Sequence, residues 1–208
     1  MAQLVEIHPA NPQPRLIGEV ADLVESGGII AYPTDSSYAF GWAMGNKAAQ
    51  DRIRQLKHLD KHHHFTIMCR DLSEISTYAR VDNQAYRLLK GMTPGPVTFI
   101  LPATRQVPNR LQHPRRKSIG LRIPDHAIAL ALLEALPEPL MSTTLQLPGQ
   151  AHPMNEPWQI DEKLGHELAA VVDGGPCSLD PTSVVDLTGD VPEVVRKALG
   201  DVEHLEIA

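Results

Sequence analysis

The stretch 27–42, GGIIAYPTDSSYAFGW, joins an apolar run to a row of hydrogen-bonding side chains. Residues 29–32 predict a buried strand, because short apolar runs bounded by Gly and Pro are typical of strands. Pro33 ends the run, and the polar residues TDSSY at 34–38 follow without a break. In α/β sheets, ligands bind in crevices beyond the ends of strands. The stretch therefore predicts a core strand that ends at a binding crevice.

Composition indicates one α/β domain. The chain has 208 residues, 42% of them apolar, which is enough for one sizeable core. Aromatic residues make up only 4%, so Leu, Ile, Val and Ala must build that core, as in most α/β proteins. The net charge of −6 argues against a protein coated with positive charge for nucleic acid, although it permits a local basic patch. We expect a single domain over residues 1–208.

The cysteines and the N-terminus indicate a cytoplasmic protein. Cys69 and Cys177 lie far apart and belong to no CxxC or Cys/His metal pattern, so reduced thiols are expected. The segment 1–15 has neither the basic nor the apolar region of a secretion signal. No apolar run reaches the roughly 18 residues that a membrane span requires. We therefore expect no export and no contact with membranes.

Apolar periodicity predicts strands and helices in alternation. Strands are expected at 3–9, 29–32, 65–69, 97–101, 118–124, 139–146, 169–175, 182–187 and 193–199, and helices near 16–24, after Asn46, and at 71–79, 82–92, 126–136 and 160–168. No internal repeat and no linker interrupts this order. The predicted fold is α/β, with helices around a twisted, mixed β-sheet.

Hydroxyl groups gather where the expected strands begin or end. The four clusters are Thr34/Ser36/Ser37, Ser118, Ser142/Thr143/Thr144 and Thr182/Ser183. Hydroxyl groups both donate and accept hydrogen bonds, which suits a ligand carrying an amide, a hydroxyl and phosphate oxygens. The alternative is that they cap turns and helix ends, as Ser and Thr commonly do.

Three cations are candidates for binding an anion at the same crevice: Lys57, Arg122 and Arg196. Arg122 is the most informative, because it alternates with the apolar residues of the strand 118–124. A guanidinium at such a position requires an anionic hydrogen-bond partner. That partner is either a carboxylate or phosphate of a ligand or an internal carboxylate such as Asp35. Sequence alone leaves both open.

The histidines at 62–64 and the basic run HPRRK at 113–117 allow further interpretations. Adjacent histidines point in different directions, and no Cys or carboxylate follows at structural-metal spacing, so we expect no metal site. A role for His63 or His64 in contacting a phosphate or a base from a loop is more plausible. The run 113–117 is either a solvated turn or a contact to a nucleic acid backbone.

Several strings, in this order, together resemble the YrdC/YciO-like family, which includes the threonylcarbamoyl-AMP synthases: GGIIAYPTDSSYAFG, TPGPVTFIL, SIGLRIPDH, PLMSTTLQLPG, and TSVVDL followed by EVVRKALGDV. The resemblance covers about residues 8–203, and the string LDKHHHFTIMCRDLSE is closest to the YciO branch. It implies a YrdC/RibB-like fold with a large concave pocket. It also implies a nucleotidyltransferase reaction in which ATP with Mg²⁺, threonine and bicarbonate form threonylcarbamoyl-AMP and pyrophosphate, the first step toward threonylcarbamoyladenosine in tRNA. Family members also bind double-stranded RNA.

The resemblance further implies roles for individual residues. Ser36, Arg122, Ser142 and Thr182 would contact threonine, while Lys57, Ser118, Thr144 and Arg196 would contact the nucleotide together with His63. Lys57 and Arg122 would be the catalytic residues, acting by positioning and by neutralising charge. No general base is visible.

Two signatures of the synthases are altered. Where they carry Lys-x-Arg-Pro, this chain has Lys57 followed by His58-Leu59-Asp60, so Leu59 replaces the arginine. Their Ser-Ala-Asn-x-Ser-Gly is replaced by STTLQLPG at 142–149, which lacks the asparagine. Loss of a cation from a phosphate site costs about tenfold or more in affinity or rate.

Three functions therefore stand side by side. The first is an enzyme of threonylcarbamoyl-AMP chemistry, either a weak synthase or one that breaks the adenylate down. The second is a binding module for structured RNA without chemistry, and the third is a nucleotide sensor or an unrelated small-molecule binder on the same scaffold. Monomer and homodimer are both compatible with the sequence.

Overall fold

A computed structural model describes residues 1–60 and 62–205. Within them, one mixed sheet contains β1 (Gln3–Glu6), β2 (Ile30–Tyr32), β3 (Ala39–Ala43), β4 (Thr66–Met68), β5 (Val97–Pro102), β6 (Ser118–Arg122), β7 (Leu140–Thr144), β8 (Ala170–Asp173), β9 (Ser183–Asp186) and β10 (Glu193–Arg196). The helices are α1 (Pro14–Glu25), α2 (Lys47–Leu56), α3 (Leu72–Tyr78), α4 (Asn83–Met92), α5 (Ala127–Ala135), α6 (Pro157–Leu164) and the 3₁₀ turn η1 (Glu203–Leu205). The predicted α/β class with a mixed sheet is confirmed.

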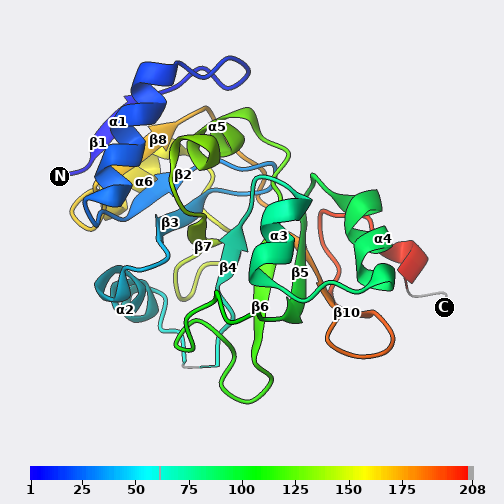
Figure 1. Cartoon of the computed structure of the whole chain (residues 1–208). Helices are drawn as coiled ribbons and strands as arrows, with labels where there is room; N and C mark the ends of the chain where they lie inside the picture. The colour runs from blue at the N-terminus through cyan, green and yellow to red at the C-terminus, as the bar shows by residue number, and fades with distance from the viewer. Residues whose placement is uncertain (61, 206–208) are drawn as a thin grey trace.

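The strands follow the order β1-β8-β2-β3-β7-β4-β6-β5-β9-β10 across the sheet. Pairs β1/β8, β2/β8, β4/β6 and β5/β9 are parallel, and the other neighbours are antiparallel. Helices α1 and α5 pack together near β1, β2 and β8, whereas α3 and α4 lie on the other side of the molecule near β5 (Figure 1). Segments distant in the sequence thus meet in the middle of the sheet, where β7, β4 and β6 adjoin.

Helices α2, α3 and α4 each begin after a residue whose side chain caps the first turn. The side chain of Asn46 accepts a hydrogen bond from the backbone N–H of Ala49 at 3.0 Å and caps α2. Asp71 and Asp82 cap α3 and α4 in the same way. Such caps satisfy backbone donors that the first helical turn leaves without partners.

Several boundaries differ from the sequence prediction. Strand β3 was not predicted, because its residues AFGWA are almost all buried and show no alternation of apolar and polar positions. Helix α6 begins at Pro157 rather than near 160, since proline is well suited to the first helical turn. Strand β10 ends at Arg196, several residues before the predicted end at 199.

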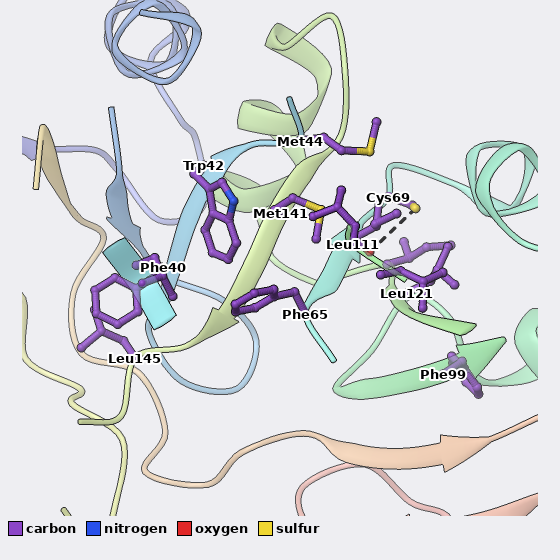
Figure 2. Packing of buried hydrophobic residues seen from close by; sticks show 14 of the residues in the cluster. Phe40, Trp42, Met44, Phe65, Cys69, Phe99, Leu111, Leu121, Met141 and Leu145 are labelled. Carbon is purple, nitrogen blue, oxygen red and sulfur yellow. Dashed lines mark hydrogen bonds between the residues drawn. The ribbon is translucent and has the colours of Figure 1, made fainter. Parts of the chain in front are cut away.

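Two apolar clusters form the core. One contains Phe40, Trp42, Phe65 and Met141, and Figure 2 shows these side chains packed between neighbouring strands. The rings of Trp42 and Phe65 meet edge to face, with centroids 5.1 Å apart. The second cluster joins α1 and α5 to β2 and β8. Within the described residues, no helix is long and apolar enough to cross a membrane.

Strand β6 alternates as predicted. Ile119 and Leu121 belong to the first core cluster, whereas Gly120 and Arg122 line a cavity on the other face. We expect Leu121→Ala to lower the free energy of unfolding by about 2–5 kcal/mol, because the side chain is fully buried. Urea denaturation measures this, with Leu4→Ala as the control, since Leu4 is 46% exposed. Equal losses in the two variants would contradict the assigned core.

Candidate functional site

A cavity of about 490 Å³ opens where strands from both halves of the chain meet. Its wall comes from β3, β4, β5, β6, β7, β9 and β10, from the turn after β2, and from the segment after α2. Eight of the predicted site residues line it: Ser36, Lys57, His63, Arg122, Ser142, Thr144, Thr182 and Arg196. The fold therefore brings together residues that the sequence separates by up to 160 positions, from Ser36 to Arg196.

The polar turn after β2 serves two purposes. The Thr34 hydroxyl donates to the carbonyl of Ser37 at 2.7 Å and accepts from the N–H of Ser36 at 3.1 Å, which holds the turn closed. Thr34, Ser36 and Ser37 also line the cavity. Tyr38 turns away and donates to the carbonyl of Gly175 at 2.8 Å. The hydroxyl cluster thus both caps a turn and faces the cavity.

Arg122 lies in the wall and has an internal carboxylate partner. Its Nη2 donates to Oδ1 of Asp35, and its Nη1 donates to the Ser36 hydroxyl at 3.1 Å. A longer contact of 3.4 Å joins Nε to the carbonyl of Gly95. Burial lowers the pKa of Arg122, and the nearby Asp35 carboxylate opposes that effect. Asp35, the internal carboxylate that the sequence offers as one possible partner, makes this contact.

Lys57 and Arg196 form a second cationic region. Lys57 Nζ donates to the backbone carbonyl of Thr144, while Arg196 donates from Nε to the carbonyl of Thr182 at 2.8 Å and from Nη2 to its hydroxyl at 3.1 Å. Burial, followed by the charge of Arg196, lowers the pKa of Lys57 to about 8. Burial also lowers the pKa of Arg196. Within residues 1–60 and 62–205 no carboxylate pairs with either cation, so their charge is available to a ligand.

The hydroxyl groups on the strands are part of a buried network. Tyr32 Oη and Ser142 Oγ lie 2.8 Å apart, and Ser142 donates to the carbonyl of Phe40 at 3.1 Å. Because the Ser142 proton is used in that bond, Tyr32 acts as the donor to Ser142. Burial raises the pKa of Tyr32 to about 12, so its proton stays in place at neutral pH. Ser142 is therefore an oriented acceptor at the cavity wall.

The histidines at 62–64 all line the cavity. Burial, helped by the charge of Lys57, lowers the pKa of His63 to about 4, so this ring is neutral at pH 7. His64 stacks on His113 with ring centroids 4.8 Å apart. Within the described residues, no three His, Cys, Asp or Glu side chains are placed to share a metal ion.

Ser118 departs from its predicted position. It is fully buried and absent from the cavity wall, and its hydroxyl lies 3.1 Å from His64 Nε2. By strand alternation residue 118 shares the face of Gly120 and Arg122, but it is the first residue of β6, opposite Pro102, and there its hydroxyl contacts His64. Ser118 therefore contacts His64, which itself lines the cavity.

The sequence interpretation missed several wall residues. Thr66 and Met68 on β4, Thr98 on β5 and Gly120 on β6 all line the cavity. Residues two apart on a strand face the same side, so Gly120 could have been found from its position two residues before Arg122. A Cβ at Gly120 would lie 3.2 Å from both the Phe65 carbonyl and the Thr66 hydroxyl, so a side chain there would crowd β4.

The family model of the Sua5, YciO and YrdC proteins, described as telomere recombination, matches residues 22–198. The chain belongs to this family. It is 50% identical to YciO of Escherichia coli strain K12 over 203 residues, 98% of each chain. The crystal structure of E. coli YciO superimposes with a TM-score of 0.95, covering 98% of both chains.

More distant members of the family are threonylcarbamoyl-AMP synthases. The synthase of Alkalilimnicola ehrlichii is 30% identical over 183 residues, 86% of this chain and 95% of that protein. P. abyssi Sua5 complexed with L-threonine matches with a TM-score of 0.89 at 23% identity, over 98% of this chain and 60% of that one. This last likeness establishes a shared fold.

The pKa of Lys57 generates a prediction about anion binding. We expect the affinity for a nucleoside diphosphate, measured by calorimetry without divalent metal, to fall about tenfold from pH 7 to pH 9, because the Lys57 ammonium loses its proton around pH 8. The terminal phosphate, with a pKa of about 6, stays ionised over this range. Lys57→Arg keeps its charge and should give a nearly flat profile. The same slope in both proteins would rule out Lys57 as the titrating group.

Proposed function

We propose that this protein binds a nucleotide and threonine in the cavity and acts in threonylcarbamoyl-AMP chemistry. One observation carries the proposal: the cavity has a cationic region without carboxylate partners, at Lys57 and Arg196, and a separate polar region at Arg122, Ser36 and Ser142. A nucleotide presents several negative charges, whereas an amino acid presents one carboxylate and hydrogen-bonding groups. The two regions correspond to these two kinds of ligand.

The cationic region suits phosphate groups. No carboxylate among the described residues neutralises either cation, and charge-assisted hydrogen bonds to phosphate are about twice as strong as neutral ones. Neutral His63 beside Lys57 adds a hydrogen-bonding ring without adding charge. This region would hold the nucleotide phosphates and neutralise charge as pyrophosphate leaves.

The polar region suits threonine. Arg122 has five N–H groups and three described acceptors, so two N–H groups remain for a carboxylate. Ser142 and Thr182 add oriented hydroxyl groups for the side chain or amine of the amino acid. The pocket acts by holding threonine, bicarbonate and the α-phosphate in reacting geometry.

Mg²⁺ belongs to the substrate in this proposal. The residues of the cavity wall include no carboxylate, and no cluster of metal ligands occurs among the described residues. Magnesium commonly binds through substrate phosphates and retains several waters. The ion would therefore enter with ATP.

Leu59 distinguishes this cavity from the synthase pattern. It lines the wall two residues after Lys57, where the synthases carry their arginine. His62, His63 and His64 lie in the same part of the wall, and burial lowers the pKa of both His63 and His64. The lowered pKa values favour the neutral rings of His63 and His64, so these two side chains do not replace the missing positive charge. We therefore propose weaker synthesis than in the synthases, or action on the adenylate in the hydrolytic direction.

Pyrophosphate release tests the proposal. We expect release that depends on ATP, threonine, bicarbonate and Mg²⁺, and that Arg196→Gln slows by tenfold or more, because one charge-assisted contact to phosphate contributes about 1.5–3 kcal/mol. Arg87→Gln removes an exposed charge from α4 and is the matched control. In parallel, synthetic threonylcarbamoyl-AMP is supplied and AMP is measured. Failure of both reactions in well-folded protein would contradict the proposed chemistry.

A second candidate, binding of structured RNA, rests on the loop at 113–117. Arg115 and Lys117 are exposed, and the loop reaches the cavity mouth through the stacking of His113 on His64. Arg116 pairs instead with Asp186 at 2.9 Å and is therefore partly committed within the protein. Two exposed cations next to a cavity that suits a nucleotide resemble a backbone-contacting surface.

The RNA candidate has its own test. If RNA binds this surface, the affinity for a double-stranded RNA at low salt should fall several-fold in Arg115→Gln/Lys117→Gln and remain unchanged in Arg87→Gln. Each lost phosphate contact removes counterion release, so both the affinity and its salt dependence decrease. A filter-binding or anisotropy titration at two salt concentrations measures this. No binding at moderate salt by the wild type would exclude the candidate.

A further inference from the structure

Asp35 lies behind the cavity wall. Its neighbours Thr34, Ser36 and Ser37 line the cavity, and so does Arg122, but Asp35 is not among the described lining residues. Its side chain is 11% exposed and that of Arg122 is 6% exposed. The carboxylate therefore holds the guanidinium from the protein side and leaves the cavity side of Arg122 to a ligand.

The charge of Asp35 is directed mainly at Arg122. Oδ1 accepts from Nη2 of Arg122, while Oδ2 is buried and has no hydrogen-bond partner among the described residues. His126 lies close enough for Asp35 to raise its pKa, but burial has the larger, opposite effect and favours the neutral ring. Tyr32 and Cys177 also face Asp35, and burial raises the pKa of both, so they stay protonated at neutral pH. Arg122 is thus the one charged partner of Asp35 among these groups.

The cations of the cavity therefore differ in net charge. Arg122 is neutralised by a buried carboxylate, whereas Lys57 and Arg196 contact only neutral oxygens in the described structure. Coulomb attraction for a compact polyanion is stronger where the positive charge is uncompensated, and burial strengthens it further. An amino-acid zwitterion, which has one carboxylate and no net charge, can still use the remaining N–H groups of Arg122, because hydrogen bonds with directional donors do not require a net charge.

We propose that Asp35 is a positioning and specificity-determining residue of the cavity. It fixes the Arg122 guanidinium and cancels its charge, so that polyanionic phosphate is directed to Lys57 and Arg196 while the Arg122 region accepts an amino-acid zwitterion. This inference rests on the proposed function, because it assigns the two ligands of that site to separate regions. In this proposal Asp35 contacts neither ligand and acts through Arg122.

The test uses inorganic pyrophosphate as the probe and needs no turnover. Calorimetry compares Arg196→Gln in the wild-type background with Arg196→Gln in an Asp35→Asn background. Asparagine keeps an acceptor for Arg122 but removes the charge. In the wild-type background we expect Arg196→Gln to weaken pyrophosphate binding at least tenfold. In the Asp35→Asn background we expect a loss below threefold, because the uncompensated Arg122 now binds the anion.

A second measurement tests whether threonine and pyrophosphate compete for the cavity. In the wild type, saturating threonine should change the affinity for pyrophosphate by less than twofold, since the two ligands occupy separate regions. In Asp35→Asn, threonine should compete with pyrophosphate, and Asp35→Glu should restore the wild-type behaviour because it restores the charge. If Asp35→Asn does not fold, competition in the wild type decides: independent binding supports the proposal.

Three results would overturn the proposed role of Asp35. Equal losses from Arg196→Gln in the two backgrounds, or competition between threonine and pyrophosphate in the wild type, would overturn the role of Asp35. Absence of measurable pyrophosphate binding to the wild type would overturn it as well. By contrast, independent binding of both ligands without any formation or breakdown of adenylate would count against the proposed chemistry and leave the role of Asp35 supported.

Discussion

The buried ion pair between Arg122 and Asp35 is the constraint on which the arrangement of the site depends. A guanidinium that is 6% exposed at the end of an interior strand cannot remain unpaired, because desolvating a charge costs several kcal/mol. The turn after β2 supplies the carboxylate, and the Ser36 hydroxyl in the same turn accepts a second hydrogen bond. These contacts connect β6 to the turn after β2. Both segments contribute to the cavity wall, so the contacts fix their relative positions there.

The same pair makes the cavity wall electrostatically uneven, with a compensated charge at Arg122 and uncompensated charges at Lys57 and Arg196. Strand alternation sends Leu121 into the core and Arg122 toward the cavity, so packing and binding are specified by adjacent residues. Lys57 and Arg196 are held by carbonyl and hydroxyl oxygens, which orient the cations without neutralising them. Leu59, two residues after Lys57, lines the same wall and adds no charge to it. Among the described residues, the uncompensated positive charge of the wall is that of Lys57 and Arg196.

The sequence predicts much of this arrangement, for identifiable reasons. Period-two alternation in residues 118–124 was enough to assign the two faces of β6, and Arg122 was singled out because it interrupts an apolar strand. Strand β3 is not predicted from the sequence, because a strand buried on both faces shows no alternation of apolar and polar residues. The structure places the Ser118 hydroxyl against His64, a tertiary contact across 54 residues that local sequence does not encode. The choice of Asp35 as the partner of Arg122 likewise depends on tertiary placement across 87 residues.

The most direct test of the account is a crystal structure of the protein with threonine and pyrophosphate bound together. The account predicts pyrophosphate against Lys57 and Arg196, and the threonine carboxylate against Arg122 and Ser36, with the Arg122–Asp35 pair intact. Pyrophosphate bound to Arg122, or a ligand carboxylate that displaces Asp35 from the guanidinium, would contradict it.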